Sequence, residues 1–248
     1  MQLNIYNKFA YLYDDLMEDV DYEKWFNYIE DIFKSYNKAP KKILEMACGT
    51  GNLSYYLGKS GYMLTCFDFS EDMLSKAYEK LRKLKNVRLI RQDMVNFKFS
   101  ETFDAVVSVC DSINYITDEK DLLKTFRNVW NHLEDGGIFI FDINSYYKLK
   151  DVIGNNTFVE DRENVFYVWE NYFDEETNIC NFYLTFFVSE DGENFTRFDE
   201  EHRERAYKVE DIVNMLIESG FSSVDYYSAF TFDIPDEKTE RINFVALK

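Results

Sequence analysis

The feature that most constrains this chain is a short apolar run that ends in a loop of small residues, Lys-Ile-Leu-Glu-Met-Ala-Cys-Gly-Thr-Gly-Asn-Leu at positions 42–53. This order is typical of a strand that leads into a tight turn and then a helix. Gly49 and Gly51 allow positive φ angles and a close approach of the backbone to a ligand, and the N–H groups that open the next helix can bind polar ligand groups. Glu45 adds a carboxylate that packing does not require. The segment predicts a site for a nucleotide-like cofactor.

The spacing of the small residues separates two kinds of cofactor. A dinucleotide fingerprint has a third small residue three positions after the second glycine, where this chain has Ser54. Small residues lie instead at the alternate positions Ala47, Gly49 and Gly51. This pattern resembles the first motif of the class I S-adenosylmethionine-dependent methyltransferases, Glu/Asp-x-Gly-x-Gly-x-Gly, with Ala47 in place of the first glycine. The resemblance implies S-adenosylmethionine as the cofactor, whereas an ordinary strand-to-turn junction is the alternative interpretation.

Further matches follow in the expected order. Residues 62–68 read as a second strand that ends in Asp68, which lies 19 residues beyond Gly49. At that spacing a carboxylate can accept hydrogen bonds from both ribose hydroxyls. Ser70 is predicted to be the N-cap of a helix over residues 71–84.

The third and fourth strands are predicted at residues 87–91 and 103–109. In the family, an acid after the third strand faces the adenine amino group, and the resemblance gives this role to Asp93. The segment 133–137, Leu-Glu-Asp-Gly-Gly, resembles the family's Leu-x-Pro-Gly-Gly turn and leads into a fifth strand at 138–142. The predicted cofactor-binding residues are Glu45, Ala47, Gly49, Asp68, Phe69, Met73, Gln92, Asp93, Met94, Cys110 (through backbone groups), Asp111 and Trp25.

Composition limits the partners. Twenty-eight Lys and Arg residues against 46 Asp and Glu give a net charge of −18, which disfavours nucleic acid as a substrate. No stretch approaches the roughly 20 apolar residues of a membrane span, and the N-terminal sequence does not resemble a signal peptide. The four cysteines have no metal-like spacing, so we predict no metal site and buried thiols in a reducing cytoplasm. These features favour a cytoplasmic protein with a small-molecule substrate and leave a homodimer open.

Residues 1–40 are predicted to form two helical segments. Apolar residues recur at helical spacing in the first of them, which is typical of an amphipathic helix packed on a sheet. The segment Phe-Ala-x-x-Tyr-Asp at 9–14 also resembles the N-terminal lid of bacterial small-molecule methyltransferases. The resemblance implies that the Tyr13 hydroxyl reaches the methyl-transfer region, and we place Trp25 over the methionine end of the cofactor.

An insertion is predicted at residues 143–205. Its aromatic and β-branched runs at 165–172, 179–188 and 195–206 favour strands, the first two joined as a hairpin. Because substrates enter over the carboxyl ends of parallel strands, an insertion after the fifth strand lies where a cap would lie. Its aromatic residues would line an apolar or cation-binding pocket, form an ordinary sheet face or make a dimer contact.

The insertion closes with a segment that resembles the Glu-x-His-Arg segment of amino-sugar N-methyltransferases. In a strand His202 and Glu204 share one face, and a histidine beside carboxylates is a plausible proton acceptor near neutral pH. A packing role for His202 is the alternative. Enzymes of that type often carry histidine where this chain has Tyr115, so the general base and a sugar substrate both stay open.

Together these observations predict a three-layer αβα Rossmann-like sandwich with a mostly parallel seven-stranded sheet. Its last two strands would lie at 223–230 and 241–247. The methyltransferase domain comprises residues 1–142 and 206–248, with 1–40 as a helical lid, and residues 143–205 form a β-rich cap.

The predicted reaction is S-adenosylmethionine-dependent methyl transfer to a small metabolite. We expect an amine nitrogen as acceptor, because no metal cluster or lysine–acid pair is visible to activate an oxygen. Tyr13, Tyr115 and His202 are the predicted catalytic residues. A catalytically inactive cofactor-binding partner and a nicotinamide-dependent oxidoreductase are the alternatives.

Overall fold

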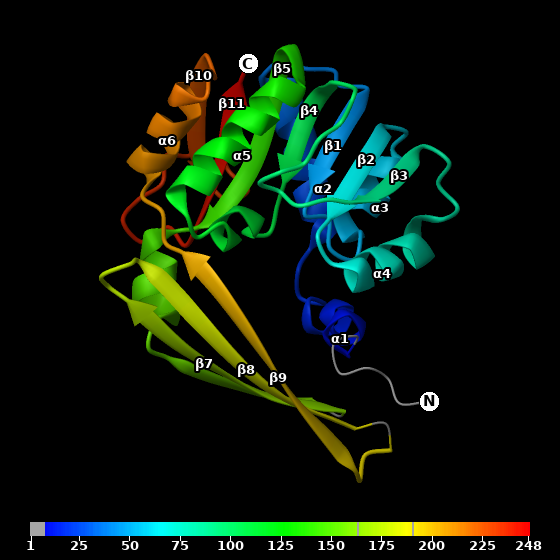
Figure 1. Ribbon diagram of the computed structural model, residues 1–248, viewed down its shortest axis with the longest axis vertical. Coiled ribbons are helices and arrows are strands. Elements are labelled where there is room, and N and C mark those ends of the chain that lie inside the picture. The colour runs from blue at the N-terminus through cyan, green and yellow to red at the C-terminus, as the bar shows by residue number, and fades with distance from the viewer. Residues whose placement is uncertain (1–7, 163, 190) are drawn as a thin grey trace.

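A computed structural model describes residues 8–162, 164–189 and 191–248. Its larger sheet has seven strands in the order β10-β11-β5-β4-β1-β2-β3 (Figure 1). β11 runs antiparallel to both of its neighbours, and the pairs among β1 to β5 in this sheet are parallel. The strands are β1 (Lys42–Met46), β2 (Met63–Asp68), β3 (Val87–Arg91), β4 (Phe103–Ser108), β5 (Leu133–Asn144), β10 (Ser223–Ser228) and β11 (Arg241–Leu247).

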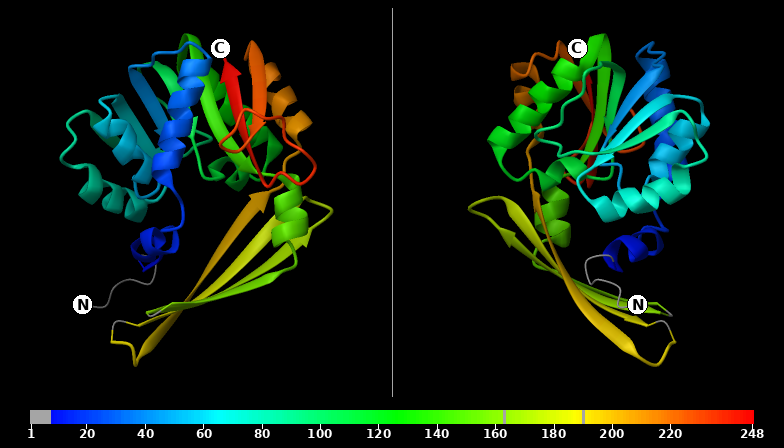
Figure 2. Two further views of the ribbon diagram at one scale, coloured as in Figure 1. Left: turned by 180° about the vertical axis from the view of Figure 1, so that it is seen from behind. Right: turned by 45° about the vertical axis from the view of Figure 1, so that its right-hand side comes forward.

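Helices cover both faces of this sheet, as the predicted three-layer sandwich requires (Figures 1 and 2). Buried side chains of α2 (Tyr22–Ser35) and α3 (Asn52–Lys59) pack on one face. Those of α5 (Glu119–His132) and α6 (Val209–Glu218) pack on the other. α4 (Glu71–Leu81) follows β2, and the Ser70 hydroxyl accepts a hydrogen bond from the Met73 N–H at 3.3 Å, which confirms the predicted N-cap.

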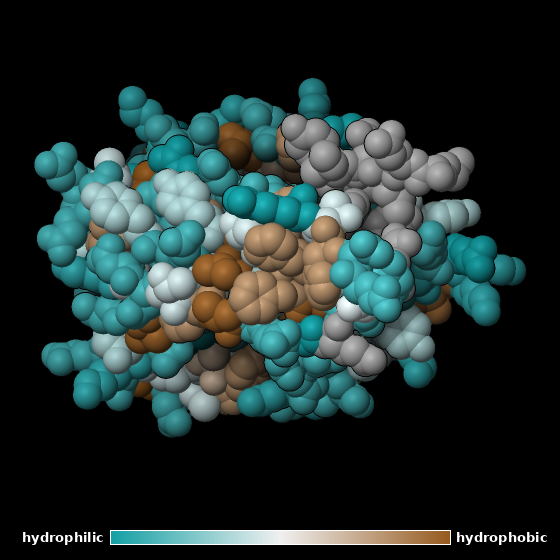
Figure 3. Space-filling model, turned by 90° about the horizontal axis from the view of Figure 1, so that it is seen from below, coloured by the Kyte–Doolittle hydropathy of each residue, from teal (hydrophilic) through white to brown (hydrophobic). Residues whose placement is uncertain are grey.

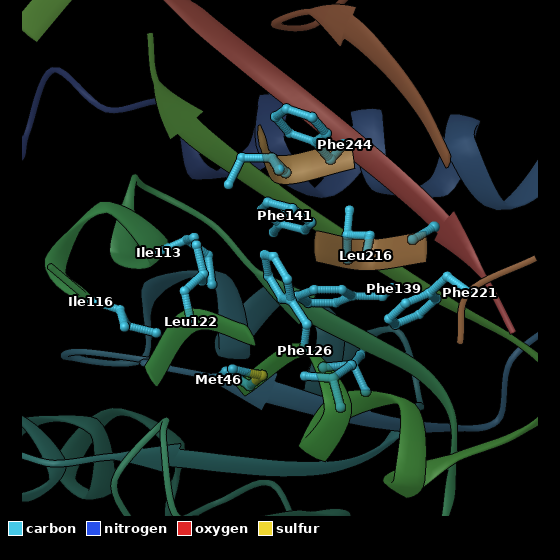
Figure 4. Packing of buried hydrophobic residues seen from close by; sticks show 14 of the residues in the cluster. Met46, Ile113, Ile116, Leu122, Phe126, Phe139, Phe141, Leu216, Phe221 and Phe244 are labelled. Atoms are coloured by element: carbon cyan, nitrogen blue, oxygen red, sulfur yellow. The ribbon is translucent and has the colours of Figure 1, made fainter. Parts of the chain in front are cut away.

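The core between the sheet and the helices α5 and α6 is unusually aromatic. Phe139 and Phe141 of β5 contact Phe126 of α5, and the ring of Phe244 on β11 stacks on that of Phe141 with centroids 5.0 Å apart (Figure 4). These residues alternate with side chains that point to the other face, so both sides of β5 are buried. The polar residues of β5 and β11, Asp142, Asn144 and Arg241, lie where this apolar packing ends.

The predicted β-rich insertion is an antiparallel sheet of four strands in the order β6-β7-β8-β9. It extends from one end of the sandwich (Figure 1). The strands are β6 (Thr157–Arg162), β7 (Val165–Asp174), β8 (Ile179–Ser189) and β9 (Phe195–Arg205). β6 is missing from the sequence-based prediction, because three consecutive charged residues, Glu160, Asp161 and Arg162, make up half of it and leave no apolar–polar alternation.

One face of this cap sheet, here called the inner face, packs against the rest of the chain. α1 (Lys8–Leu16) contributes Leu12 to a cluster with Val165, Phe186 and Phe198. The π-helical turn η3 (Lys148–Ile153) contributes Leu149 to a second cluster on the same face. The opposite, outer face lies on the side of the molecule that is seen in Figure 3. On that side, apolar surface lies among hydrophilic residues.

Other differences from the predicted elements are confined to their ends. The helix predicted at 71–84 ends at Leu81, and the strand predicted at 138–142 extends from Leu133 to Asn144. Within the described residues, no helix is both long and apolar enough to cross a membrane.

Candidate active site

The small-residue loop lies at the carboxyl end of β1 and is tied to the end of β2. The Asp68 carboxylate accepts hydrogen bonds from the backbone N–H groups of Gly49 and Ser70, each at 2.9 Å. Ala47, Gly49 and Gly51 all have positive φ angles, at 52°, 53° and 79°. Ala47, which stands where the motif has its first glycine, therefore has the left-handed backbone that glycine favours.

Glu45 lies beneath this loop. It is buried, and the Cys66 thiol donates a hydrogen bond to its carboxylate at 3.4 Å. Burial, assisted by the negative charge of Asp68, raises the pKa of Glu45 to about 7. A positive ligand at the loop would favour the ionised form of this carboxyl group.

Several other predicted cofactor-binding residues lie in or beside the loops that follow β2 and β3. Phe69 is 67% exposed, with the Arg91 guanidinium 5.7 Å from its ring centre. The Asp93 carboxylate accepts the N–H groups of Val95 and Asn96, both at 3.0 Å, and so fixes the turn after β3. The predicted residues Met73, Gln92 and Met94 are half-buried near these turns, and the Gln92 side chain bonds to the Lys98 carbonyl at 3.1 Å.

Tyr13 projects from α1 onto the small-residue loop. One of its ring carbons lies 4.0 Å from the position that a Cβ on Gly49 would occupy. Burial raises the pKa of Tyr13 well above its usual value, with Tyr22, Cys110 and Asp111 adding to the effect. Tyr13, Tyr22, Glu45, Gly49 and Cys110 are among the residues that line a cavity of about 40 Å³ at this loop.

The loop after β4 is held by a buried ion-pair cluster. Cys110 and Asp111 have positive φ angles of 59° and 54°. The Asp111 N–H donates to the Asp142 carboxylate at 3.1 Å, and Arg241 pairs with Asp111 at 2.6 Å and also with Asp142. Burial raises the pKa of Asp142 to about 6, although Arg241 opposes the shift. Arg241 therefore fixes the loop that carries two of the predicted cofactor residues.

Trp25, predicted to cover the methionine end of the cofactor, lies behind the loop after β4. It is buried in the core, with its ring against Phe230 at 4.5 Å and over the Arg241 guanidinium at 6.0 Å. Within the described part of the chain, it is not among the residues that line the loop cavity. Its packing beside Arg241 gives it an indirect connection to the site.

A second buried polar network joins the cap to the sandwich. Glu204 of β9 is 2% exposed and accepts a hydrogen bond from the Asn144 amide at 2.8 Å. The Asn144 side-chain oxygen accepts one from Lys148 at 2.9 Å, and its backbone N–H donates to Asn114 at 3.0 Å. Burial raises the pKa of Glu204 well above its usual value and lowers that of Lys148.

Tyr115 and His202 meet between these two networks. Their rings lie edge to face with centroids 5.9 Å apart, and Tyr115 is 45% exposed. Burial lowers the pKa of His202, so its imidazole is neutral near pH 7. Desolvation of the Tyr115 hydroxyl, together with the charges of Glu204 and Asp111, raises its pKa. Two of the predicted catalytic side chains are thus neighbours.

Several residues of the site were not predicted from the sequence. Asp142 and Asn144 interrupt the apolar strand Ile-Phe-Asp-Ile-Asn, and such polar residues at a strand end are a usable signal. Lys148 and Arg241 carried no comparable signal, because a single charged residue near a strand end is ordinary. The role of Arg241 depends on its contact with Asp142, 99 positions away in the sequence. That of Lys148 depends on the approach of Asn144 and Glu204 in the fold.

Known proteins that resemble this chain are methyltransferases. Residues 43–137 match a family model described as a methyltransferase domain. The putative methyltransferase YqeM of Bacillus subtilis (strain 168) is 36% identical, over 98% of this chain and 97% of its own length. The dTDP-3-amino-3,4,6-trideoxy-alpha-D-glucopyranose N,N-dimethyltransferase of Streptomyces venezuelae is 30% identical over 49% of this chain and 50% of its own length.

A solved structure matches nearly the whole fold. It is the crystal structure of an S-adenosylmethionine-dependent methyltransferase from Clostridium acetobutylicum ATCC 824. Its sequence is 44% identical to this one, its TM-score is 0.89, and the match covers 98% of this chain and 99% of that one.

Proposed function

Because this chain belongs to the class I S-adenosylmethionine-dependent methyltransferases, we propose that it methylates an amine nitrogen of a small metabolite. When bound, the cofactor supplies a methyl group already activated on a sulfonium. The protein must then hold the acceptor, exclude water and provide an unprotonated nitrogen.

The residues at the carboxyl ends of β1 to β4 fit the cofactor. The left-handed backbone of the small-residue loop leaves room at Gly49, and the Asp68 carboxylate is already oriented by two N–H donors. We assign Asp68 to the ribose hydroxyls, Asp93 to the adenine amino group and Phe69 to the adenine ring. Cys110 and Asp111 would hold the methionine end through a loop that Arg241 fixes.

The observation that carries the choice of an amine is the contact between the His202 and Tyr115 rings, near the buried carboxyl group of Glu204. Burial and the negative charge of Asp111 raise the pKa of Glu204 well above its usual value, so a cationic ligand beside it would favour its ionised form. An ammonium ion, the protonated form of an amine acceptor, is such a ligand.

The proton balance is simple in this scheme. The acceptor ammonium gives one proton to the neutral imidazole of His202, and the nitrogen lone pair becomes free to attack the methyl carbon. The hydroxyls of Tyr13 and Tyr115 stay protonated, because burial raises their pKa, and they orient the amine by hydrogen bonding. The Streptomyces relative, named as an amino-sugar N,N-dimethyltransferase, supports nitrogen as the acceptor atom.

The proposal is tested with purified protein, S-adenosylmethionine and a panel of small amines paired with the corresponding alcohols. We expect S-adenosylhomocysteine release and methylated products only with amines. His202→Asn should lower kcat/KM by about a hundredfold, the usual contribution of a general base. Arg203→Gln, on the opposite face of the same strand, is the matched control. Methylation of the alcohols alone, or cofactor binding without any methylation, would contradict the proposal.

A further inference from the structure

Asp14 makes an unusual set of contacts for a residue of a short surface helix. Its carboxylate accepts hydrogen bonds from the Thr50 hydroxyl at 2.6 Å and the Asn52 amide at 3.0 Å. Lys80 of α4 lies 3.2 Å from the same carboxylate and also bonds to the Asn52 side chain. Burial alone would raise the pKa of Asp14, but these three partners outweigh it and hold the pKa below its usual value. α1 is therefore fastened to the small-residue loop, to the start of α3 and to α4.

The opposite side of α1 contacts the cap sheet. Leu12 and Leu16 pack against inner-face residues of β7, β8 and β9. Arg162 of β6 donates a hydrogen bond to the Asp15 carbonyl at 2.5 Å and pairs with Glu18 at 3.2 Å. The helix thus bridges the cofactor loop and the cap, and Tyr13 is the neighbour of Asp14 on the loop side.

Two cavities meet at these Asp14 contacts. The inner one, at the loop, measures about 40 Å³. The outer one measures about 520 Å³ and is lined by the acidic residues 18, 19, 21 and 23 together with Tyr55, Tyr56 and Lys80. Tyr22 and Asn52 line both cavities. Asp14 therefore bonds to Asn52, which lines both cavities, and to Lys80, which lines the outer one.

With α1 in this position, Tyr13 covers the small-residue loop, and the cavity beneath it is small. Pockets that hold ligands of cofactor size measure about 300–1,000 Å³. Passage of the cofactor to the loop would involve a transient movement of Tyr13 and its helix, with the contacts of Asp14 opening and then forming again.

We infer that Asp14 is a positioning residue that seats Tyr13 on the cofactor loop and, by holding α1 there, limits how fast S-adenosylmethionine enters and leaves. The inference rests on the cofactor and not on the acceptor, so it stands or falls separately from the proposed methylation of amines. A contact that only contributes affinity changes mainly the dissociation rate, whereas a contact that holds a gate changes both rates in the same direction.

The test measures association and dissociation of S-adenosylhomocysteine and of radiolabelled S-adenosylmethionine with the full chain. Asp14→Asn keeps the shape of the side chain and removes its charge. Asp15→Asn is the matched control, because it makes the same change on the exposed side of the same helix. Lys80→Met removes one partner while leaving Asp14 in place, and thermal melting of each variant establishes that it is folded.

For Asp14→Asn we expect both rates to rise about tenfold, the effect of losing one charge-assisted hydrogen bond, while Kd changes by less than about threefold. Lys80→Met should raise both rates about threefold and add little in the double variant, since the two side chains act in one contact. Rates equal to those of Asp15→Asn would overturn the inference. A rise in the dissociation rate alone, with a matching loss of affinity, would also overturn it and make Asp14 an ordinary binding contact.

Discussion

The cofactor side and the proposed acceptor side of this site are built in different ways. On the cofactor side, carboxylates accept backbone N–H groups close to loops of one motif, as Asp68 does from Gly49 and Ser70. On the acceptor side, side chains from separate strands bond mainly to one another, as in the network of Glu204, Asn144 and Lys148. Backbone donors survive most substitutions, whereas a side-chain network fails when one member is lost. The cofactor side should therefore tolerate sequence change better than the acceptor side.

The largest effect is expected from breaking the buried ion-pair cluster that holds the loop after β4. Arg241→Met leaves Asp111 and the fully buried Asp142 without their cation. Loss of one partner from a buried pair costs about 3–5 kcal/mol, so urea denaturation should show a stability loss of that size. Arg197→Met removes an exposed pair with Asp199 and should cost less than about 0.5 kcal/mol. Equal losses in the two variants would contradict the comparison.

On the cofactor side, Asp68→Ala should weaken S-adenosylhomocysteine binding about a hundredfold and leave stability less affected. The reason is that hydrogen bonds to charged groups contribute about 1.5–3 kcal/mol each. Calorimetric titration measures the affinity, with the exposed Glu79→Ala on α4 as the control. Unchanged affinity would remove the ribose role of Asp68.

On the cofactor side, the raised pKa of Glu45 predicts how the stability of the protein changes with pH. Its pKa in the folded chain is about 7, above its usual value of 4.5. A raised carboxyl pKa means that the folded state holds the proton more tightly, so its contribution to stability is present at low pH and lost as pH rises through 7. Between pH 5 and 7 this loss is about 2 kcal/mol. Denaturation at several pH values should show a flatter profile for Glu45→Gln; an identical slope would contradict the assignment.

The smallest effect is expected at Ala47. Its φ of 52° strains a residue with a Cβ, and glycine relieves that strain but loses more entropy on folding. Ala47→Gly should therefore change stability by no more than about 1 kcal/mol and leave cofactor affinity unchanged. A loss of affinity above about threefold would show that the Ala47 methyl group contacts the cofactor. Thermal melting and the same calorimetric titration measure both quantities.

Much of the cofactor side could be predicted from the sequence, because its signals are local. The small-residue loop, the N-cap Ser70 and the acid at the end of β2 each depend on residues within about one strand and turn. The seven-stranded sheet and the methyltransferase family are confirmed. The strand β6 was missed because it has no buried residue and ends in three consecutive charged ones, so the alternation that marks a strand is absent.

The acceptor side could be predicted only in part. Period-two alternation placed His202 and Glu204 on one face of a strand, and the structure keeps them there. It gave no sign that this face meets Tyr115, nor that Asn144 and Lys148 would complete the network around Glu204. The sequence also gave no sign that the ring of Trp25 packs in the core against Phe230.

The sequence by itself determined the order of the elements, the left-handed loop and the carboxylates that surround it, because φ preferences and strand periodicity act between neighbours. Only the tertiary structure decided which charges are buried together, as for Asp142 with Arg241 and for Asp14 with Lys80. Burial is a property of the assembled fold. It raises the pKa of Glu204, lowers that of His202 and so sets the chemistry that the site can perform.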